Sequence, residues 1–254
     1  MQPIYKRMEN NLLLAATEWA CKKLFYSIDR SRMNTRSISE ALDDKIMGDI
    51  ATIAIADFIR SQGYQAVAYD QIRIDNFHEP DPGWDLALGK QGLNCWAKTT
   101  TNPKLPPKDL CFTLSVRSSR LVRDEPVEQA IMLRDFKIFA LNPNDIRLDL
   151  TADIEAQVYY SLKNTQLNNL TIERNHVFLC STTRENCQVI LEGLDVVNRF
   201  SECILTAWNF SETIANDSTM QARRTWSSFG KKMWLAPLRN GKSFNDIFIA
   251  LDKL

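Results

Sequence analysis

The sequence lacks the features that mark several common protein classes. None of its six cysteines forms a Cys-x-x-Cys pair, which argues against a zinc ribbon or a redox dithiol. No apolar run approaches the roughly 18 residues of a membrane-spanning helix, and no signal-peptide pattern precedes the first expected helix. Basic and acidic residues balance at 31 each, so no net charge draws the whole protein towards nucleic acid. We therefore expect a cytoplasmic protein with buried, reduced cysteines, no membrane contact, and any basic surface confined to one region.

The remaining composition is that of an ordinary globular protein. Hydrophobic residues make up 44% and charged residues 24% of the chain, and 254 residues suffice for one large domain with a full apolar core. We divide the chain into an N-terminal helix and basic link over residues 1–38, an α/β core over 39–200, and a basic, aromatic-rich helical extension over 201–254. We expect the extension to pack on the same domain.

Hydrophobic periodicity predicts the elements of this domain. Helical spacing occurs in the segments 9–28, 39–62, 126–141, 151–162, 200–210 and 247–254. Strand-like patterns occur in the segments 64–74, 84–88, 93–99, 112–117, 177–180 and 188–191. For the long second helix, Ser39 is the expected N-cap and Gly63 fits the position after its end. The pattern predicts an α/β fold in which helices flank a mixed central sheet.

Two of these strands carry polar side chains that can meet. Asp85 lies in the apolar segment 84–88, and Ser115 and Arg117 alternate with apolar residues in the segment 112–117. Side chains of a strand alternate between its two faces. If the two strands are neighbours, Asp85, Ser115 and Arg117 therefore come together at one edge of the sheet.

Asp49 adds a carboxylate from the helix that precedes the sheet. It lies on or beside the apolar stripe of the segment 39–62, so it needs a partner, a metal ion, or a place at the margin facing solvent. With Asp49 included, the order of elements over residues 39–141 resembles the PD-(D/E)XK nuclease superfamily, the fold of many restriction and repair endonucleases. In that superfamily a helix acid, an aspartate on the second strand and Glu-x-Lys on the third surround one or two Mg²⁺ ions.

The resemblance implies a role for each matching residue, and this sequence departs from the pattern at two of them. Asp49 and Asp85 are the implied Mg²⁺ ligands, while Ser115 and Arg117 stand where the superfamily has glutamate and lysine. Serine brings no charge to a metal ion, and arginine can clamp a phosphate but cannot act as a base. Asp81, with Glu79 beside it, is a rival for the strand aspartate.

Three functions remain open from these residues. The first is a Mg²⁺-dependent DNA endonuclease in restriction or anti-phage defence, and the acids near the strand pair favour it. The second is a catalytically inactive nuclease-fold protein that binds nucleic acid or acts as a scaffold within a larger complex. The substitutions at positions 115 and 117 favour this second hypothesis. The third is an unrelated α/β protein in which the motif is accidental.

A basic stretch near the end of the sequence is the second indication of nucleic-acid binding. Between Asp217 and Asp246 there are six basic residues and no acid, with aromatic residues among them. Basic groups neutralise phosphates, and exposed aromatic rings can stack on bases. The expected contacts to nucleic acid are Arg120, Arg223, Arg224, Trp226, Lys231 and Lys232. The alternative is a solvated basic face whose tryptophans belong to the core.

Overall fold

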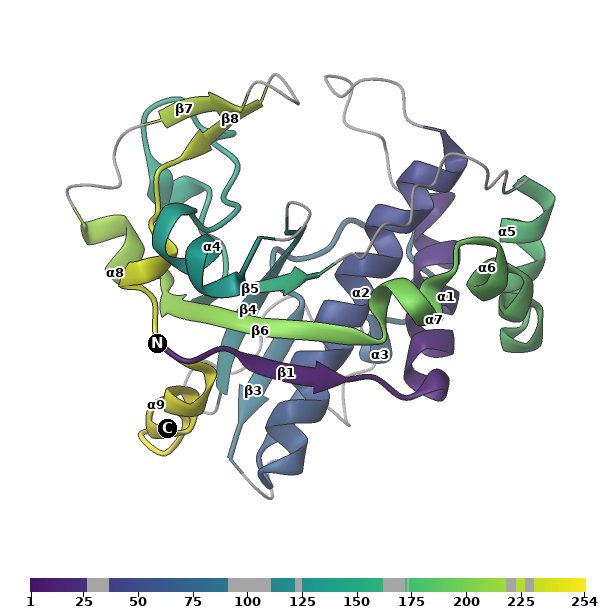
Figure 1. Cartoon of the computed structure of the whole chain (residues 1–254), viewed down its shortest axis with the longest axis horizontal. Coiled ribbons are helices and arrows are strands. Elements are labelled where there is room, and N and C mark those ends of the chain that lie inside the picture. Colours follow the sequence, from purple (N-terminus) through teal and green to yellow (C-terminus); the bar gives the residue numbers. More distant parts are fainter. Residues whose placement is uncertain are drawn as a thin grey trace.

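The computed structural model describes residues 1–26, 37–90, 111–121, 125–161, 172, 174–217, 223–226 and 231–254. It shows an α/β protein in which a six-stranded, mixed and strongly curled sheet packs against helices (Figure 1). The predicted fold class, a mixed sheet flanked by helices, is confirmed at this level. Within the described ranges, no helix has both the length and the apolar character needed to cross a membrane.

The sheet combines strands from distant parts of the sequence. Its strands are β1 (Ile4–Arg7), β2 (Gln65–Ala68), β3 (Leu86–Gly89), β4 (Cys111–Arg120), β5 (Ile154–Tyr160) and β6 (Glu202–Phe210). They are arranged in the order β1-β6-β5-β4-β3-β2. Strands β4 and β5 are parallel and every other neighbouring pair is antiparallel. Strand β1 lies at one edge, where Ile4 is opposite Leu205 of β6.

Helix α2 (Ile38–Ser61) is the longest helix of the described chain, and local chemistry fixes both of its ends. The Ser37 hydroxyl accepts a hydrogen bond from the Glu40 N–H at 3.2 Å, and the Glu40 carboxylate accepts one from the Ser37 N–H at 2.8 Å. This capping box satisfies two amides at the start of the helix. The N-cap is therefore Ser37, not the predicted Ser39. Gly63 follows the helix with φ of 86°, as its predicted place after the helix end requires.

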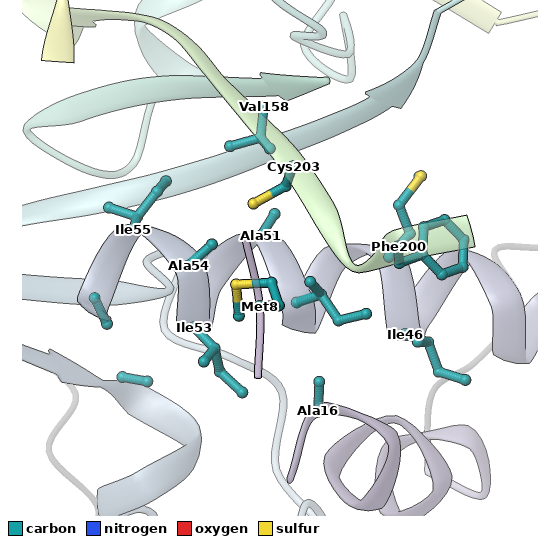
Figure 2. Packing of buried hydrophobic residues seen from close by; sticks show 14 of the residues in the cluster. Met8, Ala16, Ile46, Ala51, Ile53, Ala54, Ile55, Val158, Phe200 and Cys203 are labelled. Carbon is teal, nitrogen blue, oxygen red and sulfur yellow. The ribbon is translucent and has the colours of Figure 1, made fainter. Parts of the chain in front are cut away.

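The main core lies on both sides of α2. Helix α1 (Asn10–Leu24) covers one side of α2 and the sheet covers the other. Figure 2 shows Val158 of β5 and Cys203 of β6 next to Ala51 on the sheet side, with Ala16 of α1 on the opposite side. Small residues on α2 let the sheet approach closely, while fully buried isoleucines fill the remaining space. Each such isoleucine contributes about 1.5–3 kcal/mol by burial.

The remaining elements are short and surround this core. The described helices are α3 (Tyr69–Ile72), α4 (Val127–Leu133), α5 (Arg174–Thr182), α6 (Cys187–Gly193), α7 (Val196–Phe200), α8 (Ser211–Asn216) and α9 (Ile247–Leu251). A separate antiparallel hairpin consists of β7 (Arg223–Trp226) and β8 (Lys231–Trp234). A second apolar cluster, around Phe136, Ile138 and Trp234, lies between the other face of the sheet and this hairpin.

Several predicted elements are wrong. The segments 151–162 and 200–210 were expected to be helical but form β5 and β6. Ile154, Ala156 and Val158 alternate with Glu155 and Gln157 as in a strand, but the four-residue step from Ile154 to Val158 also fits a helix. The segments 177–180 and 188–191 were expected to be strands but lie in α5 and α6.

Other predicted boundaries need smaller corrections. The helix expected to run to residue 141 ends at Leu133, and the strand expected over 64–74 is β2 followed by α3. Helix α1 ends at Leu24 rather than at residue 28, and residues 27–28 lie outside the described ranges. The strand expected over 93–99 also lies outside them. The helix expected over 247–254 is confirmed as α9, although it is shorter.

The cysteines depart from expectation at one pair. Cys180 of α5 and Cys187 of α6 form a disulfide, so the prediction that all cysteines are reduced is wrong for them. The segments around these cysteines were predicted to be separate strands, and that prediction did not bring them together as the contact between α5 and α6 does. Cys21 and Cys203 are buried free thiols, as predicted, and Cys111 is buried. Cys95 lies outside the described residues.

Candidate functional site

Asp85 is tied into the sheet just before β3. Its backbone N–H donates to the Leu114 carbonyl at 2.9 Å, and its carboxylate accepts from the Val116 N–H at 2.7 Å. The side chain thus extends the hydrogen-bond ladder between β3 and β4 by one step. Because Leu86 is opposite Leu114, the register places Asp85 beside Ser115. The structure therefore brings these two predicted site residues together.

The Asp85 carboxylate is incompletely compensated. Burial raises the pKa of Asp85 to about 6, and the hydrogen bond from Val116 together with the charges of Lys23 and Arg117 opposes that rise. The negative charge of Asp81 adds to it. A buried carboxylate with a raised pKa costs folding free energy when it is ionised.

Arg117 is held by a residue that the sequence analysis did not consider. Its guanidinium donates from Nε to Glu155 Oε2 at 2.7 Å and from Nη2 to Glu155 Oε1 at 3.2 Å. Glu155 lies on β5 directly opposite Ser115, and its side chain is fully buried. Burial lowers the pKa of Arg117, but the Glu155 charge raises it, and the net direction is upward. A carboxylate is thus present beside Ser115, but an internal arginine already neutralises it.

Asp49 is buried rather than at the solvent-facing margin. Its Oδ1 pairs with the ammonium of Lys23 from α1, and Lys23 also pairs with Asp70 of α3. Within the described structure the other oxygen, Oδ2, has no hydrogen-bond partner. Burial raises the pKa of Asp49 to about 7, Lys23 opposes the rise, and Asp70 reinforces it. The Lys23 ammonium therefore lies among the acids at the place where the resemblance implies a metal ion.

The two rival acids lie in a network around Arg73 that shares Asp70 with the Lys23 pair. The guanidinium of Arg73 is almost fully buried and pairs with Asp75 at 2.8 Å, Asp81 at 2.7 Å and Asp70 at 3.2 Å. Glu79 contributes its backbone carbonyl, which accepts from Arg73 at 2.6 Å. This network fixes the loop between α3 and β3.

These acids do not fit a Mg²⁺ site as they stand. Mg²⁺ takes an octahedron of oxygen ligands at about 2.1 Å, usually from one or two carboxylates with water and phosphate. Asp49 is bound to Lys23, Asp85 accepts from Val116, and Ser115 adds no charge. Across the described ranges, no three histidine, cysteine, aspartate or glutamate side chains are grouped so that they could hold one metal ion. We therefore derive no reaction step through a metal.

Basic side chains gather at the C-terminal end of β4, together with two carboxylates. Arg120 pairs with Asp43 at 2.6 Å and with Asp44 at 2.8 Å. Beside it, the half-buried Lys137 donates from Nζ to the Ser118 carbonyl at 3.3 Å. Burial lowers the pKa of Lys137 and the charge of Asp44 opposes that change, while the charges of Arg120, Lys231 and Arg117 each lower the pKa further.

The β7–β8 hairpin joins this positive region through the segment that carries Lys137. The Trp234 N–H donates to the Ile138 carbonyl at 3.1 Å, and the Ala140 N–H donates to the Lys232 carbonyl at 2.9 Å. The Lys231 ammonium is 4.7 Å from the centre of the Phe139 ring. The hairpin therefore continues the positive surface that begins at Arg120.

The basic residues of the hairpin have different surroundings. Arg223 and Lys232 are exposed, and the Arg223 guanidinium is 5.5 Å from the centre of the Trp234 ring. Trp234 itself is buried and donates its indole N–H to Asp149 at 2.6 Å, so this tryptophan belongs to the core. The side chains of Arg224 and Trp226, two of the expected contacts, lie outside the described part of the structure.

Three charged residues of this region were missed from the sequence. Glu155 was hidden because its segment was expected to be a helix, although Ile154, Ala156 and Val158 also alternate as a strand requires. Lys23 and Lys137 have no local signal, since their partners are distant in the sequence.

No protein-family model matches the chain, and comparison with curated proteins and with solved structures finds no significant match.

Proposed function

We propose that this chain is a nucleic-acid-binding protein on a nuclease-like scaffold, and that it holds the phosphate backbone without cutting it. The binding surface is the cation row, defined as Arg120, Lys137, Arg223, Lys231 and Lys232. The order α2, β2, α3, β3, β4, α4, β5 supports the nuclease-like core, since Asp49 lies on α2, Asp85 directly before β3 and Ser115 on β4. DNA is the expected ligand, and a larger complex is the expected setting.

Lys137 is the observation that carries this proposal. The half-buried ammonium donates to the Ser118 carbonyl at 3.3 Å, and the charges of Arg120, Lys231 and Arg117 lower its pKa while that of Asp44 raises it. The carboxylates of Asp43 and Asp44 beside Arg120 offset part of this positive charge, and a bound anion would offset more of it. A phosphate backbone offers negative charges at a regular spacing and releases counterions when lysine and arginine neutralise it.

The internal pairing of the acids supports binding without cleavage. Unpaired carboxylates would repel a phosphate backbone. Here Lys23 compensates Asp49, and Arg117 compensates Glu155, both within the folded chain. Because these cations come from the protein, Asp49 and Glu155 do not need a metal ion to lower their negative charge.

The test is a salt titration of DNA binding by Lys137→Met. Methionine keeps the length of the side chain and removes the charge, so affinity should fall and the slope of log K against log salt should become less steep by about one. Lys253→Met, an exposed lysine after α9, is the matched control and should change neither quantity. Unchanged affinity and slope for Lys137→Met would show that the cation row is only a solvated face.

A second measurement decides between scaffold and enzyme. Plasmid, linear duplex and single strands are incubated with Mg²⁺ or Mn²⁺, with and without chelator. The proposal expects no product from any substrate. Chelator-sensitive cutting that disappears in Asp85→Asn would instead establish the endonuclease, and cutting that survives this substitution would refute the assignment of the site.

A further inference from the structure

A pocket of about 510 Å³ opens between the end of α1, helix α5 and the loop after α3. Helices α1 and α5 lie side by side in Figure 1. The volume falls within the roughly 300–1,000 Å³ that small-molecule sites occupy. Four aromatic side chains form much of its lining: Phe25, Tyr26, Phe77 and Phe178.

The aromatic rings offer flat surfaces to a ligand. Phe25 and Phe178 meet edge to face, with ring centres 6.2 Å apart and an angle of 80° between the rings. Phe178 is 58% exposed and Tyr26 is 46% exposed. Rings of this size lose much apolar contact with water when a planar ligand covers them. Tyr26 packs on the His78 ring, with centres 4.1 Å apart, but Tyr26 and Phe178 keep exposed ring surface that a ligand can cover.

The polar groups of the lining favour a particular class of ligand. Asn76 and Asn175 bring carboxamides, each of which has a donor and an acceptor. Lys22 adds a positive charge at the rim, where Glu18 holds it at 2.6 Å. The lining residues of the described structure include no carboxylate. A planar heterocycle with hydrogen-bond donors and acceptors on its edge fits these two carboxamides. Because the described lining has no carboxylate, it does not repel a phosphate attached to the heterocycle.

The loop that carries two of these residues is held in an unusual backbone conformation. Asn76 and Phe77 are consecutive and have φ of 49° and 68°. A bulky residue in the left-handed region is rare, and such strain persists only when surrounding contacts impose it. Here the Arg73 guanidinium lies 4.4 Å from the centre of the Phe77 ring and is anchored by Asp75 and Asp81. The loop is thus fixed with Asn76 and Phe77 at the pocket.

We propose that this pocket binds a nucleobase, which stacks on the aromatic rings while the two carboxamides contact its edge. The base can belong to a free nucleotide or to a single strand of nucleic acid. None of the lining residues belongs to the cation row, so the inference goes beyond the proposed function and does not depend on it.

The test uses 2-aminopurine, whose fluorescence falls when it stacks. The probes are the free 2-aminopurine nucleotide, a short single strand with one central 2-aminopurine, and the same strand in a duplex. Saturable quenching of the free nucleotide identifies a nucleotide site, and quenching of the single strand alone identifies a site for a base within a polynucleotide. Absence of saturable quenching with every probe would overturn the proposal.

Variants connect the signal to the pocket. Phe178→Ala and Tyr26→Ala remove exposed rings and should each weaken binding about 10-fold, within the range for loss of one stacking partner. Leu179→Ala is the matched control, because Leu179 is 49% exposed on the same helix but does not line the pocket. Equal affinity in all three variants refutes the proposal. Lys137→Met should leave binding of the free nucleotide unchanged, so failure of the cation row and failure of the pocket are distinguishable.

Discussion

Replacing Asp85 by asparagine should stabilise the protein at neutral and alkaline pH. The substitution removes the charge of a carboxylate whose pKa burial has raised to about 6. Asparagine keeps a side-chain oxygen at the same place, so the hydrogen bond from the Val116 N–H can persist. The variant therefore separates the cost of the charge from the benefit of the hydrogen bond.

The sign and the size of the effect follow from linkage. The ordinary pKa is 3.8 and the folded value is about 6, so the folded state binds a proton more tightly than the unfolded state. The stability that this proton contributes is complete below pH 4 and is lost as the pH rises through 6. Two pKa units correspond to about 3 kcal/mol as an upper bound. Because Asp85 is only half-buried and solvent screens its charge, we expect a gain of about 1–2 kcal/mol at pH 8.

The assay is urea unfolding of wild type and Asp85→Asn between pH 4 and pH 8. The difference in unfolding free energy should grow across this range and level off above pH 7. Asp153→Asn is the matched control, because the exposed Asp153 carboxylate also accepts from a strand N–H, that of Thr113 at 2.8 Å. Asp153→Asn should not increase the unfolding free energy at any pH in this range. A loss of stability in Asp85→Asn at pH 8, or a difference that does not vary with pH, would refute the reasoning.

Two further substitutions test how the site is supported. Glu155→Gln leaves the charge of Arg117 without its buried carboxylate, so the unfolding free energy in urea should fall by about 3–5 kcal/mol. Adding Arg117→Met to this variant should recover part of the loss. If the effects of the two substitutions simply add, the pairing of Arg117 with Glu155 is contradicted. Gly83→Ala should lower the free energy of unfolding, measured by thermal denaturation, by about 1–3 kcal/mol. The φ of Gly83 is 93°, and a Cβ there would lie 2.5 Å from Thr151 Oγ1. Gly48→Ala is the contrast, since its Cβ has room in helix α2 and should add up to about 1 kcal/mol.

Local chemistry explains what the sequence could predict. Helix α2 was found because a capping serine, a long apolar stripe and Gly63 mark its course, although Ser37 and Ser39 compete for the N-cap. Strand β4 was found because its polar and apolar residues alternate at the positions that matter. The neighbourhood of Asp85 and Ser115 followed from the same alternation, since a strand leaves only two faces for a side chain.

Long-range pairing explains what could not be predicted. Strand β5 is buried on both faces, and the step from Ile154 to Val158 fits a helix as well as a strand, so Glu155 was missed with the strand that carries it. The ion pair between Asp49 and Lys23 joins residues 26 positions apart, and that between Asp43 and Arg199 joins residues 156 positions apart. No spacing rule links such partners, so the internal neutralisation of the acids became visible only in three dimensions.

The pairing of β1 with β6 has a consequence for how the chain folds during synthesis. Ile4 is made about 200 residues before its partner Leu205, which corresponds to roughly 10–40 s at ordinary translation rates. During that interval β1 has no strand to pair with, while α2, β2, β3 and β4 can already assemble. Closing this edge of the sheet is therefore a late, non-local step of the kind that slows folding. Strand β1 is synthesised before the other five strands of this sheet, yet it can pair only after β6, the last of them, has been made.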